Sequence, residues 1–185
     1  MHLNNFKIFH FINSFELNYI RKLDKKINLI YRNYKKPINY KLLISLRNYC
    51  KSNNIKLYLA NNLKIAKKYN LDGVYIPSFN KELKINYFTK RKKFKILGSA
   101  HNILEIKQKE KQRVNCIFLS PVFITKKSSK FLGIHRFNNL ANYTSKKIVC
   151  LGGIKKNNLK KIKLLNTYGF SSVSLFKQNI KYISF

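Results

Sequence analysis

A short apolar stretch that runs into two glycines is the first candidate for chemistry. Residues 148–151 read as a buried strand, Gly152 and Gly153 follow at once, and apolar residues recur at helical spacing over 157–165. Glycine lets a backbone approach a ligand closely and exposes its N–H groups, and the start of a following helix favours an anion. The same pattern also occurs in plain turns, so the rest of the chain must supply the context for a phosphate site.

The elements that would position these glycines recur along the chain. Further stretches with the length and composition of strands lie at 6–12, 27–31, 55–59, 73–76, 94–98, 116–119 and 173–176. Helical patterns or helix-starting residues separate most of them, at 18–25, 42–49, 63–69, 103–111 and 137–143. Residues 81–93 have no clear period. This alternation predicts a parallel sheet, and eight units favour a closed (β/α)8 TIM barrel over an open doubly wound sheet.

The predicted barrel is compact. The chain has 185 residues, whereas barrels of this kind typically have about 250, so its loops must be short. Little chain follows the last predicted strand, which indicates a short or missing final helix. We therefore expect one domain over residues 1–185.

A (β/α)8 barrel carries its site at the C-terminal ends of its strands, commonly with a phosphate bound by the loops after strands seven and eight. Those two loops are Gly152-Gly153 and Phe176-Lys177 in the predicted order. The other strand ends present further candidates, which include Arg32, Asn61, Ser99, His101, Thr125, Lys126 and Lys127.

The charge is extreme, with 39 Lys and Arg against 6 Asp and Glu and a net charge of +33. Such a balance is typical of polyanion binders, with nucleic acid first. However, the basic residues are spread over every predicted helix and loop, and Lys, Asn, Ile, Phe and Tyr are abundant together, as A/T-rich codons would specify. We interpret the charge mainly as compositional drift, which leaves an anionic substrate compatible with either reading.

Compartment and redox state follow from what the chain contains. No apolar run approaches the ~20 residues needed to cross a bilayer, and polar residues interrupt the N-terminus where a signal peptide would need an apolar segment. We therefore expect no membrane partner and a cytoplasmic location. Cys50, Cys116 and Cys150 are odd in number and far apart, which indicates buried apolar residues and neither a disulfide framework nor a metal site.

Four stretches, in matching order, resemble the thiamine phosphate synthase/TenI family. Residues 71–76 are similar to the family's Ala-Asp-Gly-(Val/Ile)-His-(Leu/Ile), and residues 98–105 to its Ser-X-His-(Ser/Asn/Thr)-X-X-Glu. Residues 119–126 resemble its Gly-Pro-(Val/Ile)-(Phe/Tyr)-X-Thr, and residues 149–154 its (Ala/Gly)-Ile-Gly-Gly-Ile. The resemblance covers nearly the whole chain. It implies the barrel fold and a synthase that joins hydroxymethylpyrimidine diphosphate to thiazole phosphate, with Mg2+ on the diphosphate.

The resemblance also implies roles for individual residues. Arg32 matches an arginine after the second strand, and Ser99 matches a serine that contacts the diphosphate. Thr125 matches a threonine of the thiazole phosphate loop, and Gly152, Gly153 and the backbone at Phe176-Lys177 match the phosphate cradle. Lys126 and Lys127 lie where they could close over a diphosphate. His101 is a candidate base, with packing or hydrogen bonding as the alternative role.

The departures from the family pattern concern mainly the metal half of the site. Asn61 and Asn80 stand where the family has metal carboxylates, and a neutral amide holds a hard cation less tightly than a carboxylate does. Tyr34 stands at a lysine position, and Pro121 replaces the histidine that TenI tautomerases use. Three functions remain open: a synthase with a degenerate metal site, a TenI-like binder of thiazole phosphate without synthase activity, and a basic nucleic-acid-associated protein.

Overall fold

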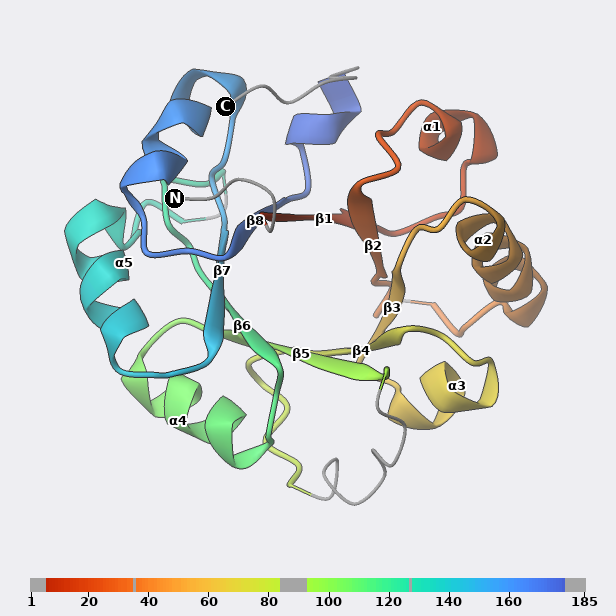
Figure 1. Cartoon of the computed structure of the whole chain (residues 1–185), viewed down its shortest axis with the longest axis horizontal. Helices are drawn as coiled ribbons and strands as arrows, with labels where there is room; N and C mark the ends of the chain where they lie inside the picture. Colours follow the sequence, from red (N-terminus) through yellow and green to blue (C-terminus); the bar gives the residue numbers. More distant parts are fainter. Residues whose placement is uncertain (1–5, 35, 84–92, 127, 179–185) are drawn as a thin grey trace.

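The computed structural model describes residues 6–34, 36–83, 93–126 and 128–178. Eight parallel strands close into a barrel in sequence order (Figure 1). This confirms the (β/α)8 fold that the alternating pattern predicts. The strands are β1 (Lys7–Ile12), β2 (Ile27–Tyr31), β3 (Leu57–Ala60), β4 (Gly73–Ile76), β5 (Lys95–Ala100), β6 (Cys116–Leu119), β7 (Lys147–Leu151) and β8 (Gly169–Ser172).

Helices surround this barrel on its outer side (Figure 1). They are α1 (Leu17–Arg21), α2 (Tyr40–Ser52), α3 (Leu63–Lys68), α4 (Ile103–Lys111), α5 (Gly133–Asn142) and two 3-10 helices, η3 (Lys156–Leu164) and η4 (Leu175–Gln178). Asparagine side chains begin three of the α-helices. Asn39, Asn62 and Asn102 each accept a hydrogen bond from the backbone N–H three residues later, which satisfies a donor that the first helical turn leaves unpaired. The segment predicted to be helical at 157–165 forms the 3-10 helix η3. Within the described residues, no helix combines the length and apolar character needed to cross a membrane.

The prediction of the last strand at 173–176 is wrong, because β8 lies at Gly169–Ser172 and the chain then turns into η4. A side chain at position 169 would place its Cβ 2.0 Å from the carbonyl oxygen of Lys7, so only glycine lets β8 pair closely with β1. The apolar residues of η4 are buried because this helix packs on the barrel. The ring of Phe176 stacks on that of Phe170 with centroids 6.1 Å apart.

Aromatic side chains fill the interior of the barrel. Phe118 contacts Phe9 and Tyr75 with ring centroids 5.0 and 5.4 Å apart, and Phe11 meets Tyr75 edge to face at 5.1 Å. Residues on the other face of each strand pack against the helices. The interior is therefore a packed core, and any site must lie above it or below it.

All three cysteines are buried and free, as the sequence predicts. Burial raises the pKa of each thiol, Cys50, Cys116 and Cys150, to about 12. The thiols are therefore neutral at physiological pH and pack as small apolar groups.

Candidate functional site

Arg32 follows β2 directly, at the end of the barrel where the C-terminal ends of the strands meet. We call this end of the barrel the upper face. The backbone N–H of Arg32 donates to the carbonyl of Ile12 at 2.8 Å, which ties the ends of β1 and β2 together. Its guanidinium carbon lies 4.6 Å from the centroid of the Phe11 ring. Among the described residues, no carboxylate lies within ion-pair distance of it. A planar cation held on an aromatic floor without a protein counter-ion suits an incoming anion.

Ser99 lies near the C-terminal end of β5. It is 4% exposed, and its hydroxyl lies close enough to Tyr75 to oppose part of the rise in the pKa of that phenol. Tyr75 is buried, and that burial raises the pKa of its phenol, so it remains neutral. Because Tyr75 contacts Phe11, the structure brings Ser99 and Arg32 together through two aromatic rings.

An exposed aromatic pair stands at the rim beside this floor. Tyr34 follows β2 and Phe79 follows β4, and their rings meet edge to face at 5.8 Å. Partial burial raises the pKa of Tyr34, and the positive charge of the nearby Arg32 offsets only part of this rise. The pair links the loops after β2 and β4 at the position where the family pattern has a lysine.

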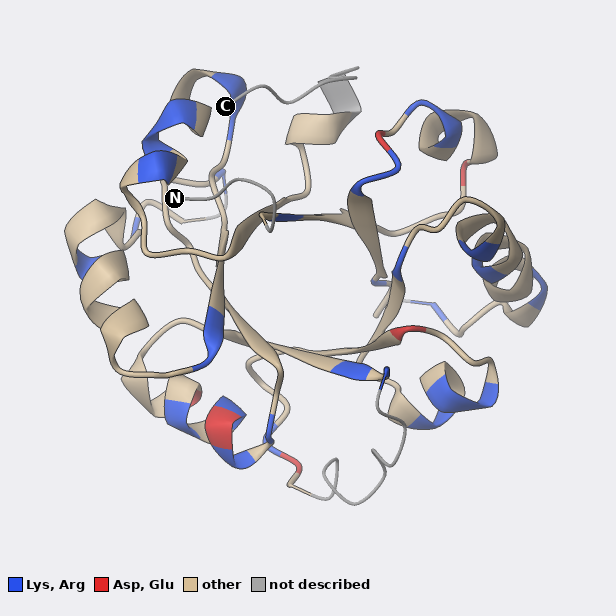
Figure 2. Cartoon of the chain, in the orientation of Figure 1, with Lys and Arg blue, Asp and Glu red and all other residues tan. Residues whose placement is uncertain are grey.

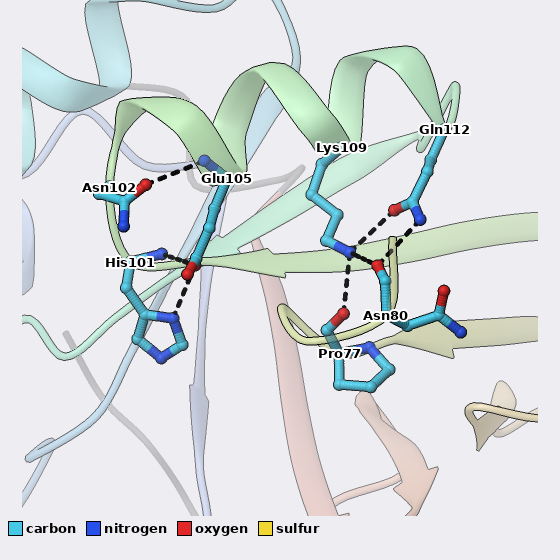
Figure 3. A network of polar contacts seen from close by, with 7 residues as sticks. All are labelled: Pro77, Asn80, His101, Asn102, Glu105, Lys109 and Gln112. Carbon is cyan, nitrogen blue, oxygen red and sulfur yellow. Dashed lines mark hydrogen bonds and ion pairs between the residues drawn. The ribbon is translucent and has the colours of Figure 1, made fainter. Parts of the chain in front are cut away.

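The side chain of His101 contacts Glu105 (Figure 3). Its Nδ1 lies 2.9 Å from Oε2 of Glu105, and its backbone N–H donates to the same oxygen at 2.8 Å. Asn102 in turn accepts from the N–H of Glu105 at 2.9 Å. Asn102 thus caps the start of α4, while Glu105 in the first turn accepts from the residue before the cap. A catalytic role for His101 stays a prediction, and the geometry supports the hydrogen-bonding alternative.

The two candidate metal ligands contact each other directly. Nδ2 of Asn80 donates to Oδ1 of Asn61 at 2.7 Å, and Oδ1 of Asn80 accepts from the N–H of Glu82 at 2.9 Å. Asn61 adopts a left-handed backbone conformation with φ of 55°, and its N–H donates to the carbonyl of Tyr75. Both amides are thus already engaged. A neutral pair of this kind does not fit a resident Mg2+ ion, which prefers carboxylate ligands. The described residues also hold no cluster of His, Cys, Asp and Glu able to bind a metal.

Lys109 on α4 holds the loop that carries Asn80, and sequence reasoning missed it (Figure 3). Its side chain is completely buried, and its Nζ donates to the carbonyls of Pro77 and Asn80 and to Oε1 of Gln112, each at 2.8 Å. Burial lowers the pKa of Lys109 to about 8, an effect that Glu105 only partly offsets. The available signal was its spacing, because Lys109 lies three residues after the buried Ile106 and so falls on the inner face of α4.

The two glycines after β7 pack against the loop after β6. Gly152 and Gly153 both have positive φ, at 94° and 70°. A Cβ on Gly153 would lie 2.4 Å from the carbonyl oxygen of Phe123 and 2.5 Å from that of Ile124. The N–H of Phe123 also donates to the carbonyl of Gly152 at 3.1 Å. Glycine is therefore required here, since only glycine allows both this backbone conformation and this approach.

The loops after β7 and β8 leave backbone donors unpaired. In the part of the chain that the structure describes, the N–H groups of Gly152, Gly153, Val173 and Ser174 have no acceptor. Because β7 and β8 are neighbours, these donors belong to one side of the upper face. Such groups are what a phosphate oxygen accepts from. The correction of β8 therefore moves the predicted cradle from Phe176-Lys177 to Val173 and Ser174.

A buried histidine fixes the end of β8, and sequence reasoning did not single it out. His10 Nδ1 lies 2.9 Å from the carbonyl oxygen of Ser172, and its Nε2 lies 2.7 Å from the hydroxyl of Tyr19. A carbonyl only accepts, so Nδ1 carries the proton and Nε2 accepts from Tyr19. The ring of Phe176 packs on His10 at 4.9 Å, which places this side chain in the core.

The remaining phosphate candidates are less clearly placed. The hydroxyl of Thr125 accepts from the N–H of Ser128 at 3.1 Å, which closes a turn in the loop after β6. Lys126 is exposed at this turn. Lys127 and the side chain of Lys177 lie outside the described residues. The structure thus groups Thr125 and Lys126 beside the glycines without showing an anion-binding role for them.

This arrangement of strand-end loops agrees with a family comparison. Residues 23–176 match the family model described as thiamine monophosphate synthase. The chain belongs to the thiamine phosphate synthase/TenI family. The match covers β2 to β8 and includes the described candidate residues from Arg32 to Phe176.

Individual members of the family share 35% and 26% sequence identity with this chain over somewhat less than two thirds of its length. The chain is 35% identical over 124 residues to the thiamine-phosphate synthase of Prochlorococcus marinus, covering 64% of this chain and 33% of that protein. It is 26% identical over 120 residues to the enzyme of the same name from Methanococcus vannielii, covering 63% of this chain and 57% of that one. The chain thus spans between a third and just over half of these relatives.

Solved structures support the fold. The thiamine phosphate pyrophosphorylase of Pyrococcus furiosus superimposes with a TM-score of 0.77 at 16% identity, over 96% of this chain and 94% of that chain. That of Bacteroides thetaiotaomicron gives 0.61 at 17% identity, over 91% and 83%. At these identities the likeness concerns the barrel alone.

Proposed function

We propose that the chain acts as a thiamine phosphate synthase, joining hydroxymethylpyrimidine diphosphate to thiazole phosphate with release of diphosphate. The observation that carries the proposal is the set of unpaired N–H groups at the ends of β7 and β8, at Gly152, Gly153, Val173 and Ser174. A phosphate monoester bound there would leave its ring above the aromatic floor of Phe11 and Tyr75. Arg32, stacked on that floor, would receive the second anion.

Charge and positioning would supply most of the catalysis. The bond between the pyrimidine methylene and the diphosphate oxygen breaks, and the diphosphate leaves with the bonding electrons. The lone pair of the thiazole ring nitrogen forms the new C–N bond to the methylene carbon. Cations already held in place stabilise that charge without reorganising, and Arg32 and Lys126 are the candidates for this role. Holding both substrates at one end of the barrel removes the entropic cost of bringing them together.

The pair of asparagines fits a site that works with little or no metal. Two carboxylates at Asn61 and Asn80 would repel a diphosphate unless a metal lay between them. Neutral amides remove this repulsion. The protein's own cations would therefore have to neutralise the leaving group.

The same pair also motivates a second candidate, a TenI-like protein that binds thiazole phosphate without joining it to the pyrimidine. The 2.7 Å bond between Asn80 and Asn61 closes the position of the metal while the phosphate cradle stays open. In that reading the cradle at Gly152 and Gly153 is the preserved half of the site.

Two measurements on the purified chain distinguish these functions. The first is formation of thiamine phosphate from both substrates, with Mg2+ and with a chelator, at high protein concentration. The second is calorimetric titration with thiazole phosphate alone. Product in either buffer supports the synthase. Binding of thiazole phosphate without product above background rejects the synthase and supports the TenI-like reading. Absence of both rejects both.

A further inference from the structure

A large cavity opens at the end of the barrel opposite to the upper face, where the strands begin. Its volume is about 620 Å3, within the range of small-molecule sites. We call it the basal lysine pocket. It is lined by Lys7, Phe9, Asn28, Lys56, Tyr58, Asp72, Lys93, Lys95, Leu97, Asn115, Cys116, Lys147 and Tyr168.

Four of these lysines form one layer inside the barrel mouth. Side chains alternate along a strand, so a residue two positions before an inward-facing one also faces inward. The inward-facing residues Phe9, Tyr58, Leu97 and Val149 lie on the odd-numbered strands β1, β3, β5 and β7. Two positions before them stand Lys7, Lys56, Lys95 and Lys147. One layer of a barrel interior takes its side chains from alternate strands, and here that layer consists of lysine.

The pocket is hollow because the next layer is half glycine. The strand register pairs Phe9 with Asn28, Tyr58 with Gly73, Leu97 with Cys116 and Val149 with Gly169. Gly73 and Gly169 contribute no side chain to this layer. The floor of the pocket is therefore apolar and aromatic, while its rim is basic.

The lysines have little protein counter-charge. Asp72 is the one carboxylate on the pocket wall, and its Oδ1 lies 3.0 Å from Nζ of Lys56. Among the described residues, Lys7, Lys95 and Lys147 have no carboxylate within ion-pair distance. Nζ of Lys147 lies 4.4 Å from the centroid of the Tyr168 ring, which attracts the cation without neutralising it.

An adjoining cavity extends the same electrostatic environment. It has a volume of about 290 Å3 and shares Lys56, Asp72 and Lys93 with the basal pocket. Arg47 also lines it, and within the described residues its Nε is a buried donor without a hydrogen-bond partner. A buried unpaired donor costs free energy that an anion would recover.

The basic surface as a whole does not explain this arrangement. Figure 2 shows Lys and Arg on helices all around the barrel and on segments of β1, β5 and β7 that belong to the barrel wall. Exposed lysines of the outer helices, such as Lys160 and Lys161 on η3, extend into water. Those of the basal layer face one opening, where their mutual repulsion is relieved by a multivalent anion.

We propose that the basal lysine pocket binds a small organic anion with two or more phosphate groups, with a nucleoside triphosphate as the best-fitting class. The phosphates would lie among Lys7, Lys95 and Lys147. The apolar group would lie on the floor formed by Phe9, Tyr58 and Leu97. The pocket is at the end of the barrel opposite to Arg32, so this site is independent of the proposed synthase activity.

The experiment is calorimetric titration of the full chain with ATP and, separately, with inorganic triphosphate, at physiological salt. The basal variant is Lys7→Gln/Lys95→Gln/Lys147→Gln. The matched control is Lys160→Gln/Lys161→Gln/Lys163→Gln, which removes the same charge from exposed positions of η3. We expect the basal variant to lose at least about tenfold in affinity for ATP, because charged hydrogen bonds are removed, while the control changes little. Tighter binding of ATP than of triphosphate would identify the apolar floor as part of the site.

Three outcomes would overturn the proposal. Equal losses in the basal and control variants would show a general charge effect. Loss of binding in Arg32→Gln with retention in the basal variant would place the anion at the upper site. Binding of a single-stranded oligonucleotide that requires the basal lysines, without competition by ATP, would identify a strand-binding surface instead.

Folding of the basal variant is checked independently. Removal of mutually repelling charges should leave the thermal midpoint of the unliganded protein unchanged or raise it, most clearly at low salt. If the triple variant does not fold, the single variant Lys147→Gln is titrated in its place. An unchanged affinity for ATP in that variant would contradict the proposal.

Discussion

Nδ2 of Asn80 donates a 2.7 Å hydrogen bond to Oδ1 of Asn61 across the ends of β4 and β3. The bond joins the two loops at the positions where the family resemblance implies metal ligands. It satisfies one amide with the other, so neither side chain carries charge into the site. The loop of Asn80 is also held from below by Lys109 and Gln112. This side of the site is therefore ordered by hydrogen bonds within the protein.

Replacing both asparagines by aspartate should create a dependence on Mg2+. In Asn61→Asp/Asn80→Asp the amide bond is lost and two like charges face each other, so we expect the free energy of unfolding to fall by about 1–3 kcal/mol in a chelator. Millimolar Mg2+ should restore much of this loss by occupying the position between the carboxylates. Thermal midpoints with and without Mg2+ measure both effects.

The control for that variant is Asn54→Asp. Asn54 is an exposed asparagine with the same left-handed backbone, at φ of 55°, but it is on the loop before β3. Its substitution should introduce no response to Mg2+. A double variant whose midpoint is equally insensitive to Mg2+ would contradict the assignment of this position to a former metal site.

Gly153→Ala should damage the phosphate cradle more than the backbone conformation alone requires. The new Cβ would meet two carbonyl oxygens of the β6 loop, at Phe123 and Ile124, so that loop must move. We expect weaker binding of thiazole phosphate, by about tenfold or more, together with a lower thermal midpoint. Titration calorimetry and thermal unfolding measure the two effects.

Gly133→Ala is the matched control. Gly133 also has positive φ, at 68°, but its added Cβ would meet only the Phe131 ring at 3.9 Å. It should therefore cost about 1–2 kcal/mol for the left-handed conformation and leave phosphate affinity nearly unchanged. Equal losses of affinity in both variants would indicate that Gly153 acts only through general stability.

Lys109→Met tests the buried lysine beneath the Asn80 loop. The carbonyl of Pro77 and Oε1 of Gln112 lose a donor, so we expect the free energy of unfolding to fall by about 1–3 kcal/mol near neutral pH. Lys107→Met, on the exposed side of α4, should cost less than about 1 kcal/mol. Faster amide exchange over residues 77–82 in the Lys109 variant alone would localise the effect.

The pH dependence of that effect has a definite sign. Burial lowers the pKa of Lys109 to about 8, below its ordinary value of 10.5, so the unfolded chain binds more protons between these two pH values. Stability therefore rises with pH over this window in the wild type, relative to Lys109→Met. Denaturant unfolding at intervals from pH 7.5 to pH 10.5 measures the difference. If the free energy of unfolding of the wild type, relative to Lys109→Met, instead fell with pH, the site would stabilise the charged ammonium of Lys109, which would contradict the lowered pKa.

The barrel could be predicted from sequence because β1 to β7 are apolar runs separated by helical patterns or turn residues. β8 was misplaced because its residues, Gly-Phe-Ser-Ser, are mostly small and polar. Gly169 is required because a Cβ there would meet the backbone of Lys7 on β1, and the other three residues are buried by the closed barrel and the elements packed on it. Both are tertiary constraints. The more apolar run that follows, with Phe176, belongs to a helix that covers the strand end.

The position of the site was more predictable than its contacts. Arg32 and the two glycines follow from strand ends alone. The direction of a side chain does not, and so the pairing of His101 with Glu105 and the bond between Asn61 and Asn80 emerged only from the structure. Lys109 shows the same limit, because a lysine on a basic helix is normally solvated and only its packing partners show that it is buried.

Arg32 provides the final prediction, because its planar group is stacked 4.6 Å from the centroid of Phe11. Lysine keeps the charge but cannot stack or donate two parallel hydrogen bonds to a phosphate. We therefore expect Arg32→Lys to weaken binding of the pyrimidine diphosphate by about tenfold and Arg32→Gln by more, with thermal midpoints nearly unchanged because no protein carboxylate is left unpaired. Arg21→Lys, at the end of α1, is the control and should bind normally. Full affinity in Arg32→Gln would exclude Arg32 from the diphosphate site and make Lys126 the next described cation to test.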